Sequence, residues 1–422
     1  MMVYDNINII FYKPFTFIFM LIESTFIMVE LLSPGGNLEK IRIAIDYGAD
    51  AVYSGYKKFG LRSRAGNLDK NQIKEAIAFV HKSGRKFYLT LNSYLFDKEF
   101  DELIDFLKFL NNYPPDALIV SDLGVLNVVN ELTNIPIHMS TQANITNSYA
   151  ARILKRYNVE RIVAAREMDI NDIRSFVKNS SIDLEVFVHG AMCMAYSGRC
   201  FLSSYLTGRS ANQGDCAQSC RWKYTVVEET RKDAPITIEE HKEGSFIFNS
   251  YDMCAVEILD EIIDAGVSSI KIEGRMKSVY YTAAATAVYR NAVDTILSGG
   301  DYKAKIPFYM DELKKISHRP YSLGFYKDKP MQYIRSSGYE RNCDFIAIVE
   351  KKSKDRIYLK LRGQLKKGKY EFFTHNLRVV YIDIEKIYNI DDTEKSIGNP
   401  NEFVYICADI NVERFDILRR CN

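Results

Sequence analysis

The chain has 422 residues, of which 47% are hydrophobic and 26% charged, and its 56 Lys and Arg residues nearly balance 54 Asp and Glu. This length exceeds what one hydrophobic core usually serves, so a large domain and a smaller one are expected. The balanced charge excludes a global attraction to nucleic acids or membranes, and any such interaction must be local.

The first 27 residues differ from the rest of the chain. They contain an apolar run from Phe15 to Ile22, which is too short to span a bilayer and lacks a convincing small-residue cleavage site. We expect residues 1–27 to be an extension from an upstream translation start, with the functional protein beginning at Met28. A membrane anchor is the alternative interpretation.

Residues 28–300 show short β-branched segments that alternate with amphipathic helical patterns. Strands are expected at residues 29–33, 51–54, 87–91, 117–120, 136–140, 161–164, 184–188 and 269–272. Helical patterns cover residues 72–81, 100–110, 149–157, 256–265 and 282–297. Eight strands alternating with helices predict an α/β fold, a closed parallel (β/α)₈ barrel of the TIM type. A doubly wound open sheet is disfavoured because Ser33-Pro34-Gly35-Gly36-Asn37 lacks the dinucleotide-binding glycine spacing.

A Cys-rich insertion at residues 190–255 interrupts this alternation and contains four closely spaced thiols. Cys193, Cys200, Cys216 and Cys220 fall within 28 residues, and Gly190, Gly198 and Gly214 precede three of them closely. Glycine lets backbone N–H groups approach sulfur, as iron–sulfur sites require. Spacing alone gives equal weight to a structural zinc site, and buried free thiols are a third possibility.

The other four cysteines are expected to have different roles. Cys254 is a reserve ligand, because it stands alone where a helical pattern opens, whereas Cys343, Cys407 and Cys421 are expected to be structural. Eight cysteines so distributed do not resemble a secreted disulfide framework. The sequence therefore predicts a reducing cytoplasm, a metal site and no stable membrane association.

After a predicted linker at residues 301–340, the pattern changes at residues 341–422. Strands are expected at residues 345–349, 357–361, 369–373, 379–384 and 403–408, which predicts a small antiparallel β-barrel domain. Between Lys351 and Arg378, ten Lys or Arg residues face only Asp355 and Glu371. This stretch is a candidate phosphate-binding surface, with a solvated basic face as the alternative.

Polar residues follow the predicted barrel strands, where this fold places catalytic groups. The candidates are Asn37, Tyr53, Asn92, Asp122, Gln142, Asn144, Arg166, Glu167, His189, Glu273 and Arg275. Two guanidinium groups at one mouth, Arg166 and Arg275, indicate a site for a small anionic substrate. Several of the others, Asp122 among them, serve equally well as helix caps. His189 lies four residues before Cys193, so it either links the pocket to the cluster or hydrogen-bonds a ligand sulfur.

Several motifs together resemble the U32 peptidase family. They are Glu30-Leu31-Leu32-Ser33-Pro34-Gly35-Gly36-Asn37, Gly48-Ala49-Asp50-Ala51-Val52-Tyr53, Glu185-Val186-Phe187-Val188-His189-Gly190-Ala191-Met192-Cys193, Ser197-Gly198-Arg199-Cys200 and Lys271-Ile272-Glu273-Gly274-Arg275. The resemblance covers nearly everything after Met28, including a C-terminal β-domain similar to that of the tRNA-modifying branch. It implies a [4Fe–4S] cluster on Cys193, Cys200 and Cys216, with Cys220 carried over as the fourth ligand.

The resemblance also implies a reaction. Members of the tRNA branch support oxygen-independent 5-hydroxylation of the wobble uridine, with prephenate as the hydroxyl source. Arg166 and Arg275 would then hold the two carboxylates of prephenate, with Tyr53, Asn92 and Gln142 around the substrate. His189 or Glu273 would move protons. The basic stretch of the β-domain would contact tRNA.

Two other functions stay open at this point. A collagenase-like cysteine peptidase could pair Cys193 with His189, although a thiol among three others suits a ligand better, and the zinc-peptidase motif His-Glu-x-x-His is absent. A non-catalytic RNA-binding or assembly module would explain the basic β-domain but leave the polar barrel mouth without a role.

Overall fold

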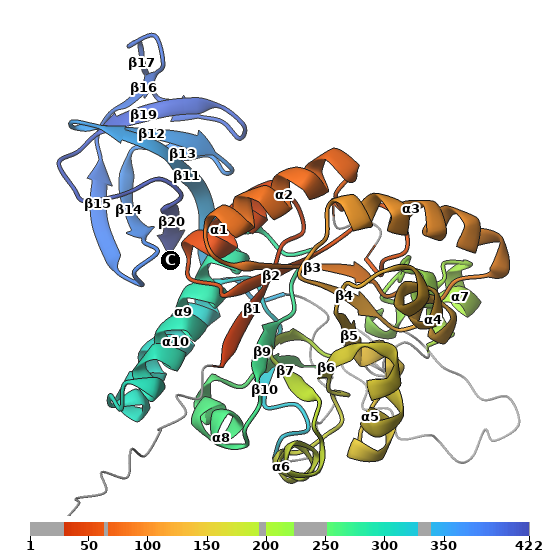
Figure 1. Ribbon diagram of the computed structural model, residues 1–422. Coiled ribbons are helices and arrows are strands. Elements are labelled where there is room, and N and C mark those ends of the chain that lie inside the picture. The colour runs from red at the N-terminus through yellow and green to blue at the C-terminus, as the bar shows by residue number, and fades with distance from the viewer. Residues whose placement is uncertain (1–28, 63–65, 194–199, 223–250, 328–338, 422) are drawn as a thin grey trace, which may run out of the picture.

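The computed structural model describes residues 29–62, 66–193, 200–222, 251–327 and 339–421 (Figure 1). The predicted N-terminal extension lies outside these ranges, as do Gly198 and residues 223–250 of the insertion. Within the described ranges, no helix has both the length and the apolar character that crossing a lipid bilayer requires.

The first domain is the predicted closed parallel barrel, and this fold class is confirmed. Each of the first six strands pairs in parallel with the next, up to β7, and the ring closes because β9 pairs in parallel with both β7 and β1. The barrel strands are β1 (Glu30–Pro34), β2 (Ala51–Gly55), β3 (Lys86–Leu91), β4 (Ala117–Val120), β5 (Ile137–Met139), β6 (Val159–Val163), β7 (Asp183–Ala191) and β9 (Ser269–Ile272).

Helices cover the outside of the ring (Figure 1). They are α1 (Leu38–Asp46), α2 (Lys70–Lys82), α3 (Phe100–Asn112), α4 (Leu123–Leu132), α5 (Ser148–Leu154), α6 (Ile170–Asn179), α8 (Leu259–Asp264) and α9 (Val279–Leu297). Side-chain caps start several of them. Asn37 accepts a hydrogen bond from the Lys40 N–H, and Asp122 accepts hydrogen bonds from two N–H groups of α4. These two candidates from the mouth therefore serve as helix caps.

The barrel interior contains a chain of buried charges. Arg161 lies 2.5 Å from Glu30 and 3.4 Å from Glu185, and Glu185 accepts a 2.8 Å hydrogen bond from Lys271. Tyr88 donates to Glu30 at 2.7 Å. Buried charges are tolerated when they are paired, and here two carboxylates face two cations. This series of charges ends at Lys271, near the carboxyl ends of the barrel strands.

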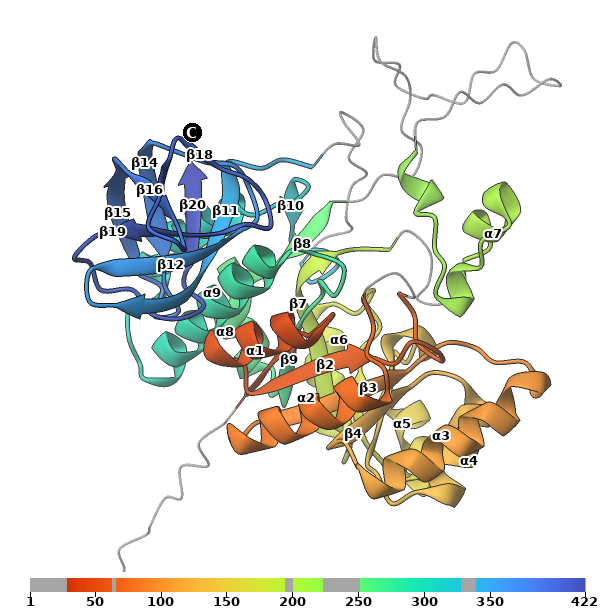
Figure 2. The ribbon, with the colours of Figure 1, turned by 90° about the horizontal axis from the view of Figure 1, so that it is seen from above.

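Two short strands extend the sheet beyond the ring. β8 (Asp252–Cys254) pairs antiparallel with β7, with Cys254 opposite His189, and β10 (Tyr321–Ser322) pairs with β8. Cys254 thus lies on a strand, where the sequence pattern had suggested the start of a helix. Helix α7 (Leu202–Thr207) lies in the insertion, outside the barrel (Figure 2).

The predicted linker contains a regular helix, α10 (Tyr302–Lys315), which lies along α9. Pro307 lies inside it, and Asp301 caps its first turn by accepting from the Ala304 N–H. The helix forms despite the proline because Tyr309 and Leu313 are fully buried against the barrel helices. Packing of this kind outweighs local propensity.

The C-terminal domain is an antiparallel, curled sheet, as predicted. Its strand order is β15-β14-β20-β11-β12-β19-β16-β17, with β13 and β18 paired separately. The strands are β11 (Cys343–Ser353), β12 (Arg356–Leu361), β13 (Leu365–Lys366), β14 (Gly368–Phe373), β15 (Val379–Ile384), β16 (Ile387–Asn389), β17 (Glu394–Lys395), β18 (Ile397–Gly398), β19 (Phe403–Cys407) and β20 (Ile417–Cys421).

This sheet is fixed to the barrel by buried polar contacts. Arg419 of β20 is fully buried and lies 2.6 Å from Glu312 of α10, 2.6 Å from Glu371 and 2.8 Å from the Tyr280 hydroxyl of α9. Cys343 and Cys421, opposite each other on β11 and β20, form a disulfide. The two domains therefore share a packed, charge-paired interface (Figure 2).

Candidate functional site

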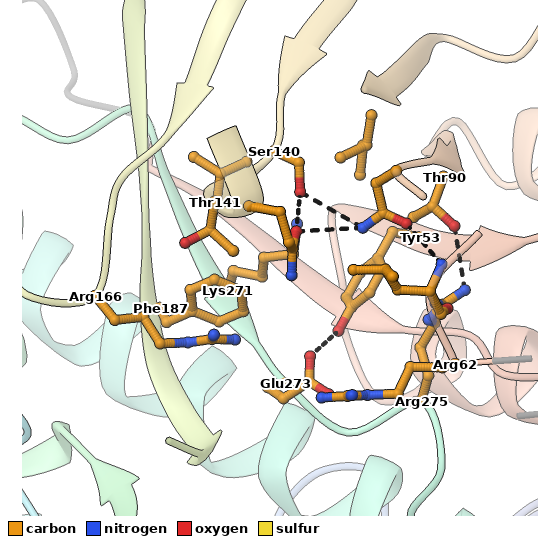
Figure 3. A pocket seen from close by; sticks show the side chains of 15 residues that line it. Tyr53, Arg62, Thr90, Ser140, Thr141, Arg166, Phe187, Lys271, Glu273 and Arg275 are labelled. Atoms are coloured by element: carbon orange, nitrogen blue, oxygen red, sulfur yellow. Dashed lines mark hydrogen bonds and ion pairs between the residues drawn. The ribbon is translucent and has the colours of Figure 1, made fainter. Parts of the chain in front are cut away.

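A polar pocket opens at the carboxyl ends of the barrel strands (Figure 3). It contains about 440 Å³ of atom-free space, counted out to its open mouth. Its lining residues are Tyr53, Leu61, Arg62, Thr90, Asn92, Ile119, Ser140, Thr141, Gln142, Val163, Arg166, Phe187, Lys271, Glu273 and Arg275. This is the end of the barrel where the fold places chemistry.

The structure brings together six of the seven side chains predicted for catalysis or substrate binding. Those that line the pocket are Tyr53, Asn92, Gln142, Arg166, Glu273 and Arg275. The seventh, His189, does not line it. Four cations face one lining carboxylate, which suits a small anion.

Glu273 is the one carboxylate of the lining. Its Oε1 lies 3.6 Å from Arg62 Nη2, and its Oε2 lies 3.4 Å from the Tyr53 hydroxyl. Burial alone would raise the pKa of Glu273, but the charges of Arg62, Arg166, Arg275 and Lys271 together hold it below its usual value. Glu273 is therefore ionised at neutral pH. Burial also raises the pKa of Tyr53 well above its usual range, so this hydroxyl remains a hydrogen-bond donor.

Arg275 is almost fully buried and fastens the loop that follows β2. Its guanidinium donates to the Leu61 carbonyl, to Thr90 Oγ1 at 3.2 Å and to Asn67 Oδ1 at 3.5 Å. A Cβ on Gly55 would lie only 2.2 Å from Arg275 Nη1, so a larger residue at the end of β2 would displace this guanidinium. Much of the hydrogen-bonding capacity of Arg275 is thus used within the protein, whereas Arg62 and Arg166 are less enclosed.

Amide side chains form the opposite wall of the pocket. Asn92 Oδ1 accepts from the Leu61 N–H at 3.0 Å, and its Nδ2 donates to Gln142 Oε1 at 3.4 Å. Gln142 Oε1 also accepts from Ser140 Oγ, and the Gln142 backbone carbonyl accepts from the Tyr94 hydroxyl at 2.8 Å. Asn92 and Gln142 therefore occupy fixed positions, as hydrogen-bonding groups that recognise a substrate must.

Arginine side chains link this pocket to the thiols of the insertion. Arg166 Nη1 lies 3.9 Å from Cys193 Sγ, and its guanidinium lies 4.2 Å from the Phe187 ring centroid. Burial would lower the pKa of Arg62, but Glu273, Cys193 and Cys216 raise it on balance. Arg62 therefore feels the charge of the pocket carboxylate and of two of the predicted ligands.

The insertion is held against the pocket loop by close backbone approaches. A Cβ on Gly214, whose φ is +91°, would lie 2.7 Å from the Gly60 carbonyl oxygen. A Cβ on Gly190, whose φ is +107°, would lie 2.4 Å from the Glu273 carbonyl oxygen. These two glycines therefore allow two backbone segments to come into contact. A separate hydrogen bond runs from the Gln218 N–H to Cys216 Sγ, at 3.3 Å.

The four predicted ligands fit an iron–sulfur cluster in their chemistry. Cys193, Cys200, Cys216 and Cys220 are not joined in disulfides and are at least partly exposed. Within the described residues, no three of their sulfur atoms lie within 4.8 Å of one another. A single tetrahedral zinc would bring the sulfurs to about 3.8 Å from one another. A four-iron cluster binds each cysteine to a different iron and so suits a wider arrangement.

Cys254 differs from these four thiols. It is buried beside Tyr289 and Met310, and burial raises its pKa to about 12. A thiol in such a setting resists the deprotonation that metal binding requires.

In the part of the chain described, only one group of ligand atoms is close enough together for a single ion. It consists of Cys343, Glu371 and Cys421, and its two cysteines form the disulfide.

His189 lies in an aromatic cage next to β8. Its ring centroid lies 5.4–5.6 Å from those of Tyr281, Tyr289 and Tyr321. Nδ1 lies 3.5 Å from the Tyr289 hydroxyl, and Nε2 has no hydrogen-bond partner among the described residues. Burial, helped by Lys277 and His318, lowers the pKa of His189 to about 3, so the ring is neutral at physiological pH.

Sequence reasoning missed two cations of the pocket. Arg62 follows β2, so the rule that selected Tyr53 would have found it if extended along the loop. Lys271 lies within β9, where a lysine in a buried strand is itself a signal that the barrel interior is charged. Thr90, Ser140 and Thr141 also line the pocket.

Comparison with known proteins identifies relatives along most of the chain. Residues 36–335 match the model of peptidase family U32. An uncharacterized protease of Methanocaldococcus jannaschii is 41% identical over 305 residues, which cover 71% of this chain and 73% of that protein. The tRNA hydroxylation protein P1 of Bacillus subtilis is 33% identical over 399 residues, covering 93% of this chain and 94% of that protein. The 23S rRNA 5-hydroxycytidine C2501 synthase of Escherichia coli is 37% identical over 297 residues, covering 69% of this chain and 44% of that protein.

Proposed function

The chain belongs to peptidase family U32, and on that premise we propose that it hydroxylates the wobble uridine of tRNA at C5 without oxygen. In this proposal a [4Fe–4S] cluster is held by Cys193, Cys200, Cys216 and Cys220, and prephenate is the hydroxyl donor. The relative named for tRNA hydroxylation matches nearly the whole chain, including the C-terminal domain.

One observation carries the proposal, the continuity between the anion pocket and the thiols. Arg166 Nη1 lies 3.9 Å from Cys193 Sγ, and Arg62 lies 3.6 Å from Glu273. Cys193 and Cys216 also contribute to raising the pKa of Arg62. A substrate held by these arginines would therefore lie beside the predicted cluster. When bound, a [4Fe–4S] cluster supplies one-electron redox capacity at that position.

The side chains of the pocket take separate roles in this proposal. Arg62 and Arg166 bind the carboxylates of the donor, because their guanidinium groups are less enclosed than that of Arg275. Arg275 positions the loop that carries Arg62. Glu273, ionised and 3.4 Å from the Tyr53 hydroxyl, is the group placed to accept a proton.

A peptidase is the competing function, favoured by the name of the archaeal relative. It would pair a Cys193 thiolate with His189 as the base. His189 is 1% exposed and lies among tyrosines, whereas Cys193 is exposed, and no hydrogen bond joins them in the described structure. We therefore favour RNA hydroxylation.

The test expresses the full chain in a host that lacks its own tRNA hydroxylation proteins and measures tRNA nucleosides by mass spectrometry. Wild-type protein should restore 5-hydroxyuridine derivatives and, purified anaerobically, contain about four irons per chain. Arg166→Ala should keep its iron but lose activity about 30- to 1,000-fold, because a charge-assisted contact of roughly 2–4 kcal/mol is removed. The matched control, Arg152→Ala on exposed α5, should keep both.

Unmodified tRNA combined with iron-independent cleavage of peptides would overturn the proposal in favour of the peptidase. Stoichiometric zinc in a colourless, active protein would overturn the cluster assignment alone. Full activity of Arg166→Ala would reject the assigned anion site.

A further inference from the structure

The outer surface of the C-terminal sheet carries a row of tyrosines across three strands. Along β12, Ile357, Leu359 and Leu361 are buried, so Tyr358 and its alternate neighbours face the opposite side. Tyr358 lies opposite Tyr405 of β19, and Tyr405 lies opposite Tyr388 of β16. The ring centroids are 5.5 Å and 5.0 Å apart. Tyr358 and Tyr388 are half-buried, whereas Tyr405 between them is only 3% exposed.

Cations lie over this aromatic row. Lys351 Nζ lies 4.5 Å from the Tyr358 ring centroid, and the Arg356 guanidinium lies 4.7 Å from that of Tyr405. In the next row, Lys360 Nζ lies 5.9 Å from the ring of Phe403, which is 51% exposed. We call Tyr358, Tyr388, Tyr405, Lys351, Arg356 and Lys360 the tyrosine face.

Acidic groups only partly neutralise the tyrosine face. Asp392 lies 2.8 Å from Arg356, and Glu39 of α1 lies 3.5 Å from Lys360 and contacts Arg362. Lys351 has no acidic partner among the described residues, and at the far edge Glu394 is engaged by Lys367 at 3.2 Å. The face therefore keeps an excess of positive charge, which complements a polyanion.

We propose that the tyrosine face binds a single-stranded segment of RNA, with bases stacked on the half-buried rings of Tyr358 and Tyr388 and phosphates near its cations. Aromatic side chains that stack bases beside basic groups that follow the backbone are the combination that binds single strands with little sequence preference. A protein partner would need a more apolar centre than one bordered by three cations. The inference rests on the proposed RNA substrate and assigns a second contact site to it.

The tyrosine face has a fixed position relative to the barrel. Glu39, which pairs with Lys360, belongs to the first barrel helix, and the sheet lies against α1 and α9 (Figure 2). Because buried Arg419 fixes the sheet to the barrel, RNA bound here has a set orientation relative to the pocket. The basic stretch as a whole is less specific, since Lys366, Lys367 and Lys369 lie on or beside β13 and β14, outside this row.

The experiment measures binding of the full chain to a fluorescent single-stranded oligoribonucleotide and to a duplex of the same sequence, by anisotropy at several salt concentrations. Tyr358→Leu should weaken single-strand binding about tenfold, whereas Tyr358→Phe should not, because the ring is what stacks. Lys351→Gln should lower the slope of log K against log salt by about 0.7. Its matched control is Lys369→Gln, an exposed lysine on β14.

Single-strand binding that depends on the Tyr358 ring and on Lys351 supports the proposal, even if no hydroxylated nucleoside is ever detected. Equal effects of Lys351→Gln and Lys369→Gln, with no effect of Tyr358→Leu, would overturn it in favour of general attraction to polyanions. A preference for duplex RNA would overturn it, as would a change in oligomeric state on Tyr358→Leu with unchanged RNA binding. If Tyr358→Leu does not fold, the salt slope of Lys351→Gln still decides.

Discussion

Gly55, the last residue of β2, tests whether Arg275 holds the loop over the pocket. A Cβ at this position would lie 2.2 Å from Arg275 Nη1 and 2.8 Å from Asn67 Oδ1. Ordinary contact begins near 3.4 Å, so Gly55→Ala forces the guanidinium to retreat by about 1.2 Å. A guanidinium displaced this far cannot keep its present geometry, and therefore the hydrogen bonds to Leu61 and Thr90 should lengthen or break.

The expected magnitude follows from these contacts. A hydrogen bond from a charged group contributes about 1.5–3 kcal/mol, and a buried guanidinium that loses its acceptors is costly. We therefore expect Gly55→Ala to lower the free energy of unfolding by about 2–4 kcal/mol. Displacing the loop that carries Arg62 by about 1 Å should reduce hydroxylation roughly 100-fold.

Urea denaturation of the purified protein and quantification of tRNA nucleosides measure the two effects. Gly60→Ala is the control in the same loop, because its Cβ would meet Thr90 atoms at 3.3 Å and 3.4 Å and needs only a slight adjustment. That variant should change stability by less than about 1 kcal/mol. Equal stability and activity of the two variants would refute the reasoning that Arg275 works by fixing the loop.

Three further predictions concern the thiols, the buried histidine and the disulfide. Cys200→Ala should lose iron and hydroxylation together, whereas Cys254→Ala should keep both in anaerobic metal analysis; loss of iron only in the latter would make Cys254 a ligand. Burial holds the pKa of His189 at about 3, below its usual 6.5, so the unfolded chain binds more protons between these values and stability falls as pH falls. Between about pH 7.5 and about pH 5.5, the wild type should lose about 1.4 kcal/mol more unfolding free energy than His189→Gln, and parallel profiles in urea titrations would contradict this. Cys343→Ser should cost roughly 2–4 kcal/mol under oxidising conditions, because the disulfide with Cys421 spans 78 residues, and dithiothreitol should abolish the difference; a variant as stable as the oxidised wild type would argue against the bond.

Periodicity in the sequence was sufficient to predict the barrel and the residues at its mouth. Buried parallel strands are continuous β-branched runs, so their ends can be located, and the fold itself dictates that the residues after those ends converge. Tyr53, Asn92, Gln142, Arg166, Glu273 and Arg275 were predicted on this basis and line one pocket. The cluster of four thiols could also be recognised from the sequence, because ligands supplied by one short segment leave a local pattern.

Only the tertiary structure decided what depends on contacts between distant segments. The pairing of β7 with the three-residue strand β8 places His189 among tyrosines and away from the pocket, and a strand so short has no detectable period. α10 forms around Pro307 because it is buried against α9, a gain that local propensity does not contain. The role of Arg275 as the fastener of a loop depends on Leu61, 214 residues away, and such a contact exists only when the barrel closes.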